Sequence, residues 1–232
     1  MRILAVETAT PLGSVSLVDE EVVILERESG AATTHSTWLL PAIGELLREA
    51  GLSPGEVDGF AVSAGPGSFT GLRIGLSTVK GLSLATGKPV VAVPTLDAMA
   101  EPVPPCPHLI CPLLDARKEE VYVALYRHIP GGSLRRQGDC LVMPPRMLAR
   151  MISENVFFLG NGVDHYRELL VELFGEKAFF ASSNLRYPKA TTVGQLGLRL
   201  LAQGRTEDVD GLEPLYVRLS EAELKNRDRS EQ

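Results

Sequence analysis

The sequence contains no apolar run that approaches the roughly 18 uninterrupted residues of a membrane span. The N-terminus has one arginine, a short apolar run and then Glu7, so we expect no signal peptide. The three cysteines, Cys106, Cys111 and Cys140, lack C-x-x-C spacing, which disfavours a disulfide framework and a zinc knuckle. We therefore expect a cytoplasmic protein that makes no membrane contact.

Positive charge and histidine are also scarce. The chain has 23 Lys and Arg residues against 29 Asp and Glu residues, a formal net charge of −6. A broad basic face for duplex nucleic acid is therefore not expected. The four histidines, His35, His108, His128 and His165, lie far apart without ligand spacing, so we expect neither a metal nor another cofactor. Hydrophobic residues make up 44% of the chain, which is enough for a normal core.

Hydrophobic patterning predicts an α/β chain in which one order of elements occurs twice. The first half predicts strands at 2–8, 14–19 and 21–28, a helix at 36–50, a strand at 57–65, a helix at 71–86, a strand at 89–93 and a helical turn or two at 95–100. The second half predicts strands at 108–115, 119–128 and 138–143, a helix at 144–152, a strand at 155–162 and helices at 164–174 and 193–203. The proline-rich stretch EPVPPCP at 101–107 separates the halves.

This order predicts two lobes, at 1–104 and 105–211, each with a mixed sheet flanked by helices. The last segment, 212–232, is expected to pack back on the first lobe and to fray at its charged end. In the second lobe, Asp115 and Arg117 of DARKEE predict a local pair that shapes a hairpin.

The stretch AVSAGPGSFTGLRIGLSTVKGLSLATG, at 61–87, places a glycine-rich turn between a strand and a helix. Backbone N–H groups at a helix N-terminus favour anions, which makes Gly65, Gly67, Ser68, Thr70 and Arg73 candidate contacts of a nucleotide or another anion. The lysine of a Walker motif and the spacing of a Rossmann motif are both missing. A capped turn without a ligand therefore fits the local sequence equally well.

The helix after this turn has an unusually narrow polar stripe. The stripe consists of Arg73, Ser77 and Lys80. A helix with one buried face should have a wider polar side, so we expect this helix to be covered on two sides. Either the chain's own elements cover both sides or a partner subunit covers one of them, and we favour a partner. The glycines of the helix would then let a second helix approach closely; they are Gly71, Gly75 and Gly81.

Several segments together resemble the bacterial TsaB (YeaZ) family. They are MRILAVETATPLGSVSLV, SAGPGSFTGLRIGLSTVKGLSLATGKPVVAVPTLDAMA, LLDARKEEVYVALY, FFLGNG and PLYVRLSEAE. The resemblance implies a duplicated fold of the actin-like, sugar-kinase and Hsp70 group (ASKHA, ribonuclease H-like). It also implies a role in forming N6-threonylcarbamoyladenosine (t6A) at position 37 of tRNAs that read ANN codons.

The resemblance further implies partners. The family pairs with a catalytic paralogue, TsaD, and the ATPase TsaE joins them; a homodimer would form when TsaD is absent, and tRNA would be bound only through the complex. Catalytic relatives carry an H-x-x-x-H pair that holds a metal, whereas Thr95 and Met99 stand at those positions here. We therefore hypothesise a non-catalytic subunit rather than an enzyme. The alternative is an ATP-dependent phosphotransferase or a metallopeptidase-like hydrolase of the same fold group.

The partner interface is expected on the first two helices. Its candidate residues are His35, Trp38, Leu39, Gly71, Ile74, Gly75, Thr78 and Leu82. Trp38 fits an interface and an ordinary core position equally well. Glu7 and Thr8, by resemblance, stand at the first phosphate loop. Glu7 would then either orient a water or metal near a nucleotide, or accept N–H bonds from the turn after its strand.

Overall fold

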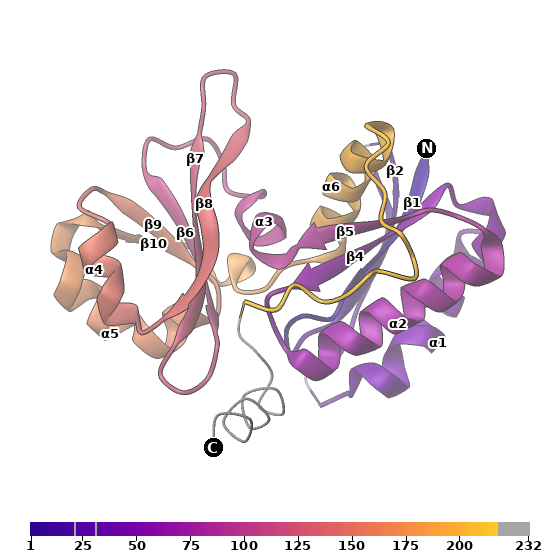
Figure 1. The fold of residues 1–232 in the computed structure, drawn as a ribbon, viewed down its shortest axis with the longest axis horizontal. Coiled ribbons are helices and arrows are strands. Elements are labelled where there is room, and N and C mark those ends of the chain that lie inside the picture. Colours follow the sequence, from indigo (N-terminus) through magenta and orange to yellow (C-terminus); the bar gives the residue numbers. More distant parts are fainter. Residues whose placement is uncertain (21, 31, 218–232) are drawn as a thin grey trace, which may run out of the picture.

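The computed structural model describes residues 1–20, 22–30 and 32–217, which form two lobes side by side (Figure 1). The strands are β1 (Arg2–Glu7), β2 (Ser14–Asp19), β3 (Val22–Glu28), β4 (Gly59–Gly65), β5 (Val90–Pro94), β6 (Leu109–Asp115), β7 (Val121–His128), β8 (Leu134–Met143), β9 (Val156–Leu159) and β10 (Ala178–Phe180). The α-helices are α1 (His35–Glu49), α2 (Phe69–Thr86), α3 (Thr95–Ala100), α4 (Leu148–Met151), α5 (Gly162–Phe174) and α6 (Ala190–Ala202). Short 3₁₀ helices lie at Pro54–Glu56, Pro145–Met147, Gly175–Lys177 and Ser183–Leu185.

The two sheets have equivalent topologies. The first has the strand order β3-β2-β1-β4-β5 and the second has the order β10-β9-β6-β7-β8. In each sheet three consecutive strands pair antiparallel, and two further strands pair parallel after a crossover. The predicted duplicated α/β fold, with two lobes that each have a mixed sheet flanked by helices, is confirmed.

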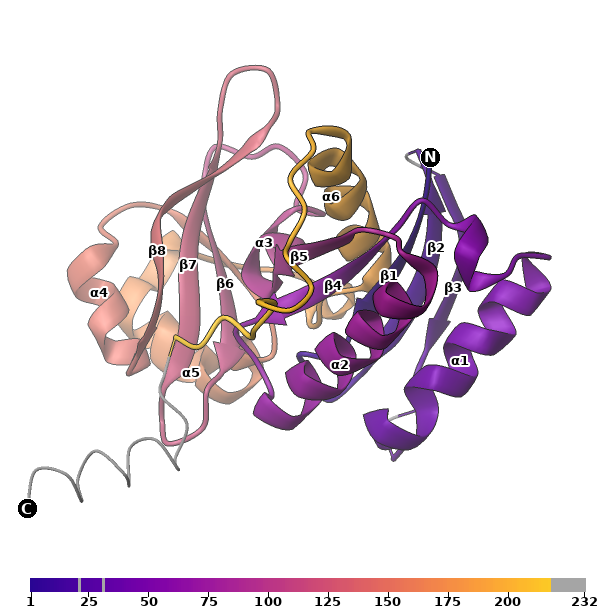
Figure 2. The same cartoon turned by 45° about the vertical axis from the view of Figure 1, so that its right-hand side comes forward.

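Burial explains why the central strands read as continuous apolar runs. Every residue of β4 is buried, as are Ile3 to Glu7 of β1, because helices cover both faces of this sheet. Figure 2 shows α1 and α2 on one face and α6 on the other. The edge strand β3 is half exposed, in keeping with its mixture of aliphatic and charged residues. Strand β10 was not predicted, because three residues are too few to give a periodic pattern.

Helix α6 covers the sheet of the first half, and helix α3 packs against both halves. Helix α6 packs on the first sheet in one apolar cluster that joins Val193 and Leu198 to Ile3, Ala5 and Ala61. Helix α3 contributes to the core of the second lobe; its members there are Leu96, Met99 and Ala100. The lobe boundaries at 1–104 and 105–211 stay a prediction, because amphipathic patterning does not reveal which sheet a helix packs against.

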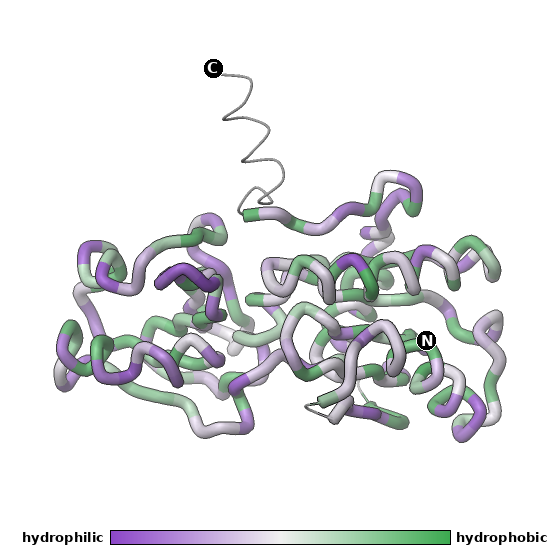
Figure 3. Tube along the Cα trace, turned by 90° about the horizontal axis from the view of Figure 1, so that it is seen from below, coloured by the Kyte–Doolittle hydropathy of each residue, from purple (hydrophilic) through white to green (hydrophobic). Residues whose placement is uncertain are grey.

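The chain returns to the first lobe after α6. The bridge between Val90 and Glu207 and the burial of Leu212 fix the start of this return. Lys80 of α2 donates to the carbonyl oxygen of Asp210 at 3.4 Å. Figure 3 shows this part of the chain, which leads into the grey trace, running along the outside of the first lobe. The packing of 212–232 on the first lobe stays a prediction, and the expected frayed end lies outside the described residues.

None of the helices within 1–20, 22–30 and 32–217 combines the length and the apolar character that a membrane span requires.

Candidate functional site

The glycine-rich turn joins β4 to α2 by close contacts within the chain. Ser68 caps α2, because its hydroxyl accepts from the backbone N–H of Gly71 at 3.2 Å. The N–H of Ser68 donates to the carbonyl oxygen of Ala9 at 2.7 Å. A Cβ atom on Gly67 would lie only 2.3 Å from that same oxygen. Glycine is therefore required here so that α2 can begin directly against the turn between β1 and β2.

The glycines inside α2 serve the same internal contact. A Cβ on Gly71 would lie 2.0 Å from the carbonyl oxygen of Thr8, and one on Gly75 would lie 2.3 Å from Thr8 Oγ1. Both glycines are buried and face their own first lobe, so neither can itself touch a partner helix. Gly81 differs, because it is exposed and no atom would lie within 4 Å of its Cβ.

Glu7 and Thr8 are sealed inside the first lobe. Thr8 Oγ1 donates to the carbonyl oxygen of Gly71 at 2.8 Å. Glu7 accepts from the N–H of Ala9 at 2.6 Å, and its other oxygen accepts from the Ser63 hydroxyl. Burial raises the pKa of the Glu7 carboxyl to about 7, against the lowering effect of these hydrogen bonds. Both side chains are fully buried, so they have no open path to a ligand, and Glu7 fits the alternative role of holding the turn after its strand.

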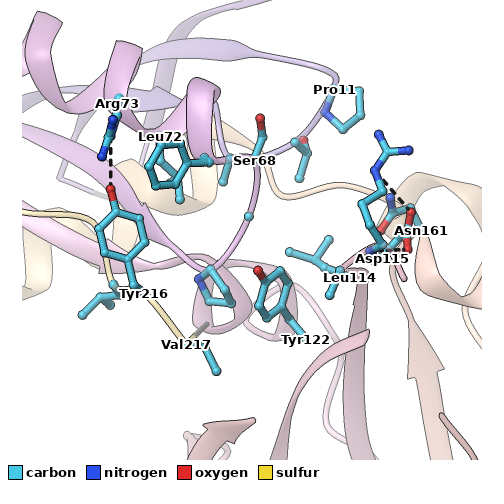
Figure 4. Close-up of a pocket in the computed structure, with 18 of the residues that line it drawn as sticks. Pro11, Ser68, Leu72, Arg73, Leu114, Asp115, Tyr122, Asn161, Tyr216 and Val217 are labelled. Atoms are coloured by element: carbon cyan, nitrogen blue, oxygen red, sulfur yellow. Dashed lines mark hydrogen bonds and ion pairs between the residues drawn. The ribbon is translucent and has the colours of Figure 1, made fainter. Parts of the chain in front are cut away.

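A cavity of about 670 Å³ lies between the lobes beside the glycine-rich turn (Figure 4). Ser68, Phe69 and Arg73 line it from the first lobe, and Tyr122 and Asn161 line it from the second. Of the predicted anion contacts, Gly67, Ser68 and Arg73 thus reach the cavity. Gly65 instead faces the C-terminal segment, since a Cβ there would lie 2.8 Å from the carbonyl oxygen of Leu215.

The loop between β6 and β7 forms the far end of the cavity. Asn161 Oδ1 accepts from the N–H of Asp115 at 3.1 Å, and Asp115 Oδ1 accepts from the N–H of Arg117 at 2.9 Å. Arg117 Nε lies 3.9 Å from Asp115 Oδ2, so the local pair predicted in this hairpin is present. Arg117, Lys118 and Glu119 all have φ between 53° and 61°, a left-handed conformation that side chains rarely adopt.

Arg73 forms the opposite end of the cavity and is held by two aromatic rings. Its guanidinium carbon lies 3.8 Å from the centroid of the Phe69 ring, and its Nε donates to the Tyr216 hydroxyl at 3.2 Å. The sequence interpretation assigned no role to Tyr216, Tyr122 or Asn161. The quoted segments PLYVRLSEAE, LLDARKEEVYVALY and FFLGNG contain them, but only the folded chain brings them together.

The predicted interface residues divide into two groups. Leu39, Gly71 and Gly75 are buried within the first lobe. The others lie half-buried along α1 and α2, and they are His35, Trp38, Ile74, Thr78 and Leu82. Leu40 and Leu84, which were not predicted, are 60% and 71% exposed on the same two helices. The outer face of this helix pair is therefore open, although three of the predicted residues do not reach it.

Comparisons with known proteins support the resemblance in sequence and in structure. A family model described as TsaD, tRNA N6-adenosine threonylcarbamoyltransferase, matches residues 28–226. The chain is 31% identical to the tRNA threonylcarbamoyladenosine biosynthesis protein TsaB of Bacillus subtilis, covering 97% of each chain. It is 29% identical to the protein of the same description from Escherichia coli, covering 94% of this chain and 95% of that one. It is also similar to the solved structure of YeaZ from Pseudomonas aeruginosa, with a TM-score of 0.76 at 30% identity over 93% of this chain and 99% of that chain.

Proposed function

Because this chain belongs to the TsaB family of tRNA threonylcarbamoyladenosine biosynthesis proteins, we propose that it is a non-catalytic subunit that binds and activates the catalytic paralogue TsaD. It acts in the cytoplasm, where TsaE joins the two proteins. Without TsaD, a second copy of this chain occupies the same surface and forms a homodimer. The complex, rather than this acidic chain alone, binds the tRNA.

The observation that carries the proposal is the outer face of α2, which bears few charges. The exposed residues of this helix other than Phe69 and Arg73 are Thr70, Ser77, Gly81, Leu84 and Ala85. Arg73 is the one charged residue among the exposed positions of α2, and the chain's own Tyr216 binds it. A helix face with few charges and several small residues allows another helix to approach closely. Leu40 and Gly44 extend this open face onto α1.

A second observation supports a non-catalytic role. Thr95 and Met99 stand where catalytic relatives have their histidine pair, and both are buried in the packing of α3. Neither side chain is a usual ligand for a hard or borderline metal ion. The alternative, a phosphotransferase or a hydrolase, needs reactive groups that are open to the cavity. Glu7 and Thr8 do not meet this need, because both are sealed inside the first lobe.

Copurification with TsaD tests the docking surface. Gly75→Arg would clash with Thr8 and disturb the fold, so the structure favours Gly81→Arg, at a position with free space. A charged, bulky side chain there should prevent close helix approach and lower retention on immobilised TsaD at least about tenfold. Leu84→Arg should give the same result on the same face.

The matched control for this experiment is Val171→Arg. Val171 is 48% exposed on α5 of the second lobe, far from α2 in the fold, so its replacement should leave TsaD retention unchanged. Circular dichroism and thermal unfolding establish that each variant is folded. Undiminished retention of both folded α2 variants would refute the assignment of TsaD to this face.

A further inference from the structure

The segment from Leu212 to Val217 crosses between the two lobes, and within these described residues its burial falls from Leu212 towards Tyr216. Leu212 is 5% exposed and packs in the apolar core of the first lobe. Leu215 and Tyr216, three and four residues later, are 49% and 37% exposed. Figures 1 and 2 show this part of the chain, in yellow, reaching the space between the lobes beside β4.

Three contacts hold Leu215 and Tyr216 against the first lobe. The N–H of Leu215 donates to the carbonyl oxygen of Ala64, at the end of β4, at 2.7 Å. The Tyr216 hydroxyl accepts from Arg73 Nε, and the Tyr216 ring stacks on Phe69 with a centroid distance of 5.3 Å. Partly exposed contacts of this kind open at a much lower cost than a buried core does.

The same segment separates two cavities. The cavity of about 670 Å³ beside the glycine-rich turn has a neighbour of about 370 Å³, which Cys140 and Arg136 line from the second lobe. The residues that line both cavities are Pro66, Leu215, Tyr216 and Val217. Three of these four belong to the segment, so the segment is the partition between the cavities.

We propose that Leu215–Val217 form a releasable strap, anchored at Leu212, whose release joins the two cavities into one cleft between the lobes. Release breaks the bond to Ala64 and the stack on Phe69, and it frees the Arg73 guanidinium to face the joined cleft. The strap thereby controls access to the space between the lobes. The strap contacts the first turns of α2 at Phe69 and Arg73, whereas the docking variants at Gly81 and Leu84 lie near the other end of that helix.

The chain's own cysteines report strap release. Cys140 lines the smaller cavity, and burial raises the pKa of its thiol to about 11, so it should react slowly while the strap is closed. Cys106 lies at a partly exposed position outside both cavities, and Cys111 is fully buried in the core of the second lobe. Alkylation of the full chain by iodoacetamide, followed by mass spectrometry, gives the rate at each thiol separately.

Tyr216→Ala removes the stack and the bond to Arg73, and it should raise the alkylation rate of Cys140 by about tenfold or more. Tyr216→Phe removes only the hydroxyl and should give a smaller increase. In both variants Cys106 should keep its rate and Cys111 should stay unreactive. The matched control is Tyr187→Ala, which removes a partly exposed tyrosine that lines neither cavity.

Hydrogen exchange supplies the second measurement, because the Leu215 amide is itself a strap contact. Its exchange should accelerate in Tyr216→Ala while amides of β1 and β4 keep their protection. The proposal fails if Cys140 reacts no faster in Tyr216→Ala than in Tyr187→Ala. It also fails if Cys111 becomes reactive and β1 and β4 lose protection, since the segment would then be part of the cooperative core.

Discussion

At the scale of single residues, Glu7 is the most informative side chain. A carboxyl group at the end of a central strand could have faced a ligand, but here it is fully buried and binds Ser63 and the turn that follows β1. Its raised pKa means that it exchanges a proton near neutral pH although it cannot reach the cavity. The raised pKa of Glu7 therefore makes the free energy of unfolding depend on pH.

The stability of the protein should fall as the pH rises from about 4.5 to about 7. Glu7 has an ordinary pKa of 4.5 in the unfolded chain and a pKa of about 7 in the folded protein. Between these values the folded state binds more protons, so each rise in pH favours unfolding. Relative to Glu7→Gln, the wild type should lose up to about 3 kcal/mol of unfolding free energy between pH 5 and pH 8.

Urea unfolding of both proteins at several pH values measures this difference. Glu56→Gln provides a contrast of opposite sign, because hydrogen bonds from Ser53 lower the pKa of the exposed Glu56 carboxyl. The Glu56 carboxylate stabilises the fold at pH values above its ordinary pKa, and this stabilisation is lost as the pH falls. If the free energies of unfolding of the wild type and Glu7→Gln change with pH in parallel, the assignment of a raised pKa to Glu7 is contradicted.

At the scale of elements, α2 combines two kinds of glycine. Gly71 and Gly75 let its inner face lie against Thr8, whereas Gly81 lies on the outer face without neighbours. The cover on two sides that the sequence predicts for this helix stays a prediction for its outer face. The sequence could not indicate which glycine faces which neighbour, because a glycine permits a close contact but does not specify the residue that makes it.

Alanine substitutions should separate these two roles. Gly71→Ala places a Cβ 2.0 Å from a backbone oxygen that cannot move aside, and overpacking of this kind costs about 1–3 kcal/mol. Gly81→Ala meets no atom and should stabilise the helix by up to about 1 kcal/mol. Chemical denaturation of the two variants measures both changes. A Gly71→Ala protein as stable as Gly81→Ala would contradict the close contact between α2 and Thr8.

At the scale of the whole molecule, the fold consists of two equivalent lobes. The last helices of the two halves, α3 and α6, pack across the division between them. The repeated order of strands and helices was predictable, since each long element carries its own hydrophobic period. The sheet against which α3 and α6 each pack was not predictable, because an apolar helix face fits either sheet. Long-range contacts were not predicted for a related reason. Tyr216 lies 143 residues from Arg73, and no local pattern connects them.

Some features of the candidate site were likewise predictable from neighbouring residues, whereas others depend on contacts between distant parts of the chain. The capped turn at Ser68 and the pair of Asp115 and Arg117 were predictable from neighbouring residues. Burial of Glu7 and Thr8 depends on how β1 meets the start of α2, which no local pattern specifies. The resemblance of the quoted segments placed the chain in its family, but it did not indicate which of the expected residues remain exposed.

Reconstituted tRNA modification tests the central proposal most directly. The assay combines unmodified ANN-reading tRNA with TsaD, TsaE and a source of threonylcarbamoyl-AMP, and it measures t6A with this chain present, absent or carrying Gly81→Arg. We predict that t6A forms only when TsaD and this chain are both present, and that Gly81→Arg reduces its formation along with TsaD binding. Formation of t6A by this chain without TsaD, or full activity of TsaD without this chain, would contradict the account.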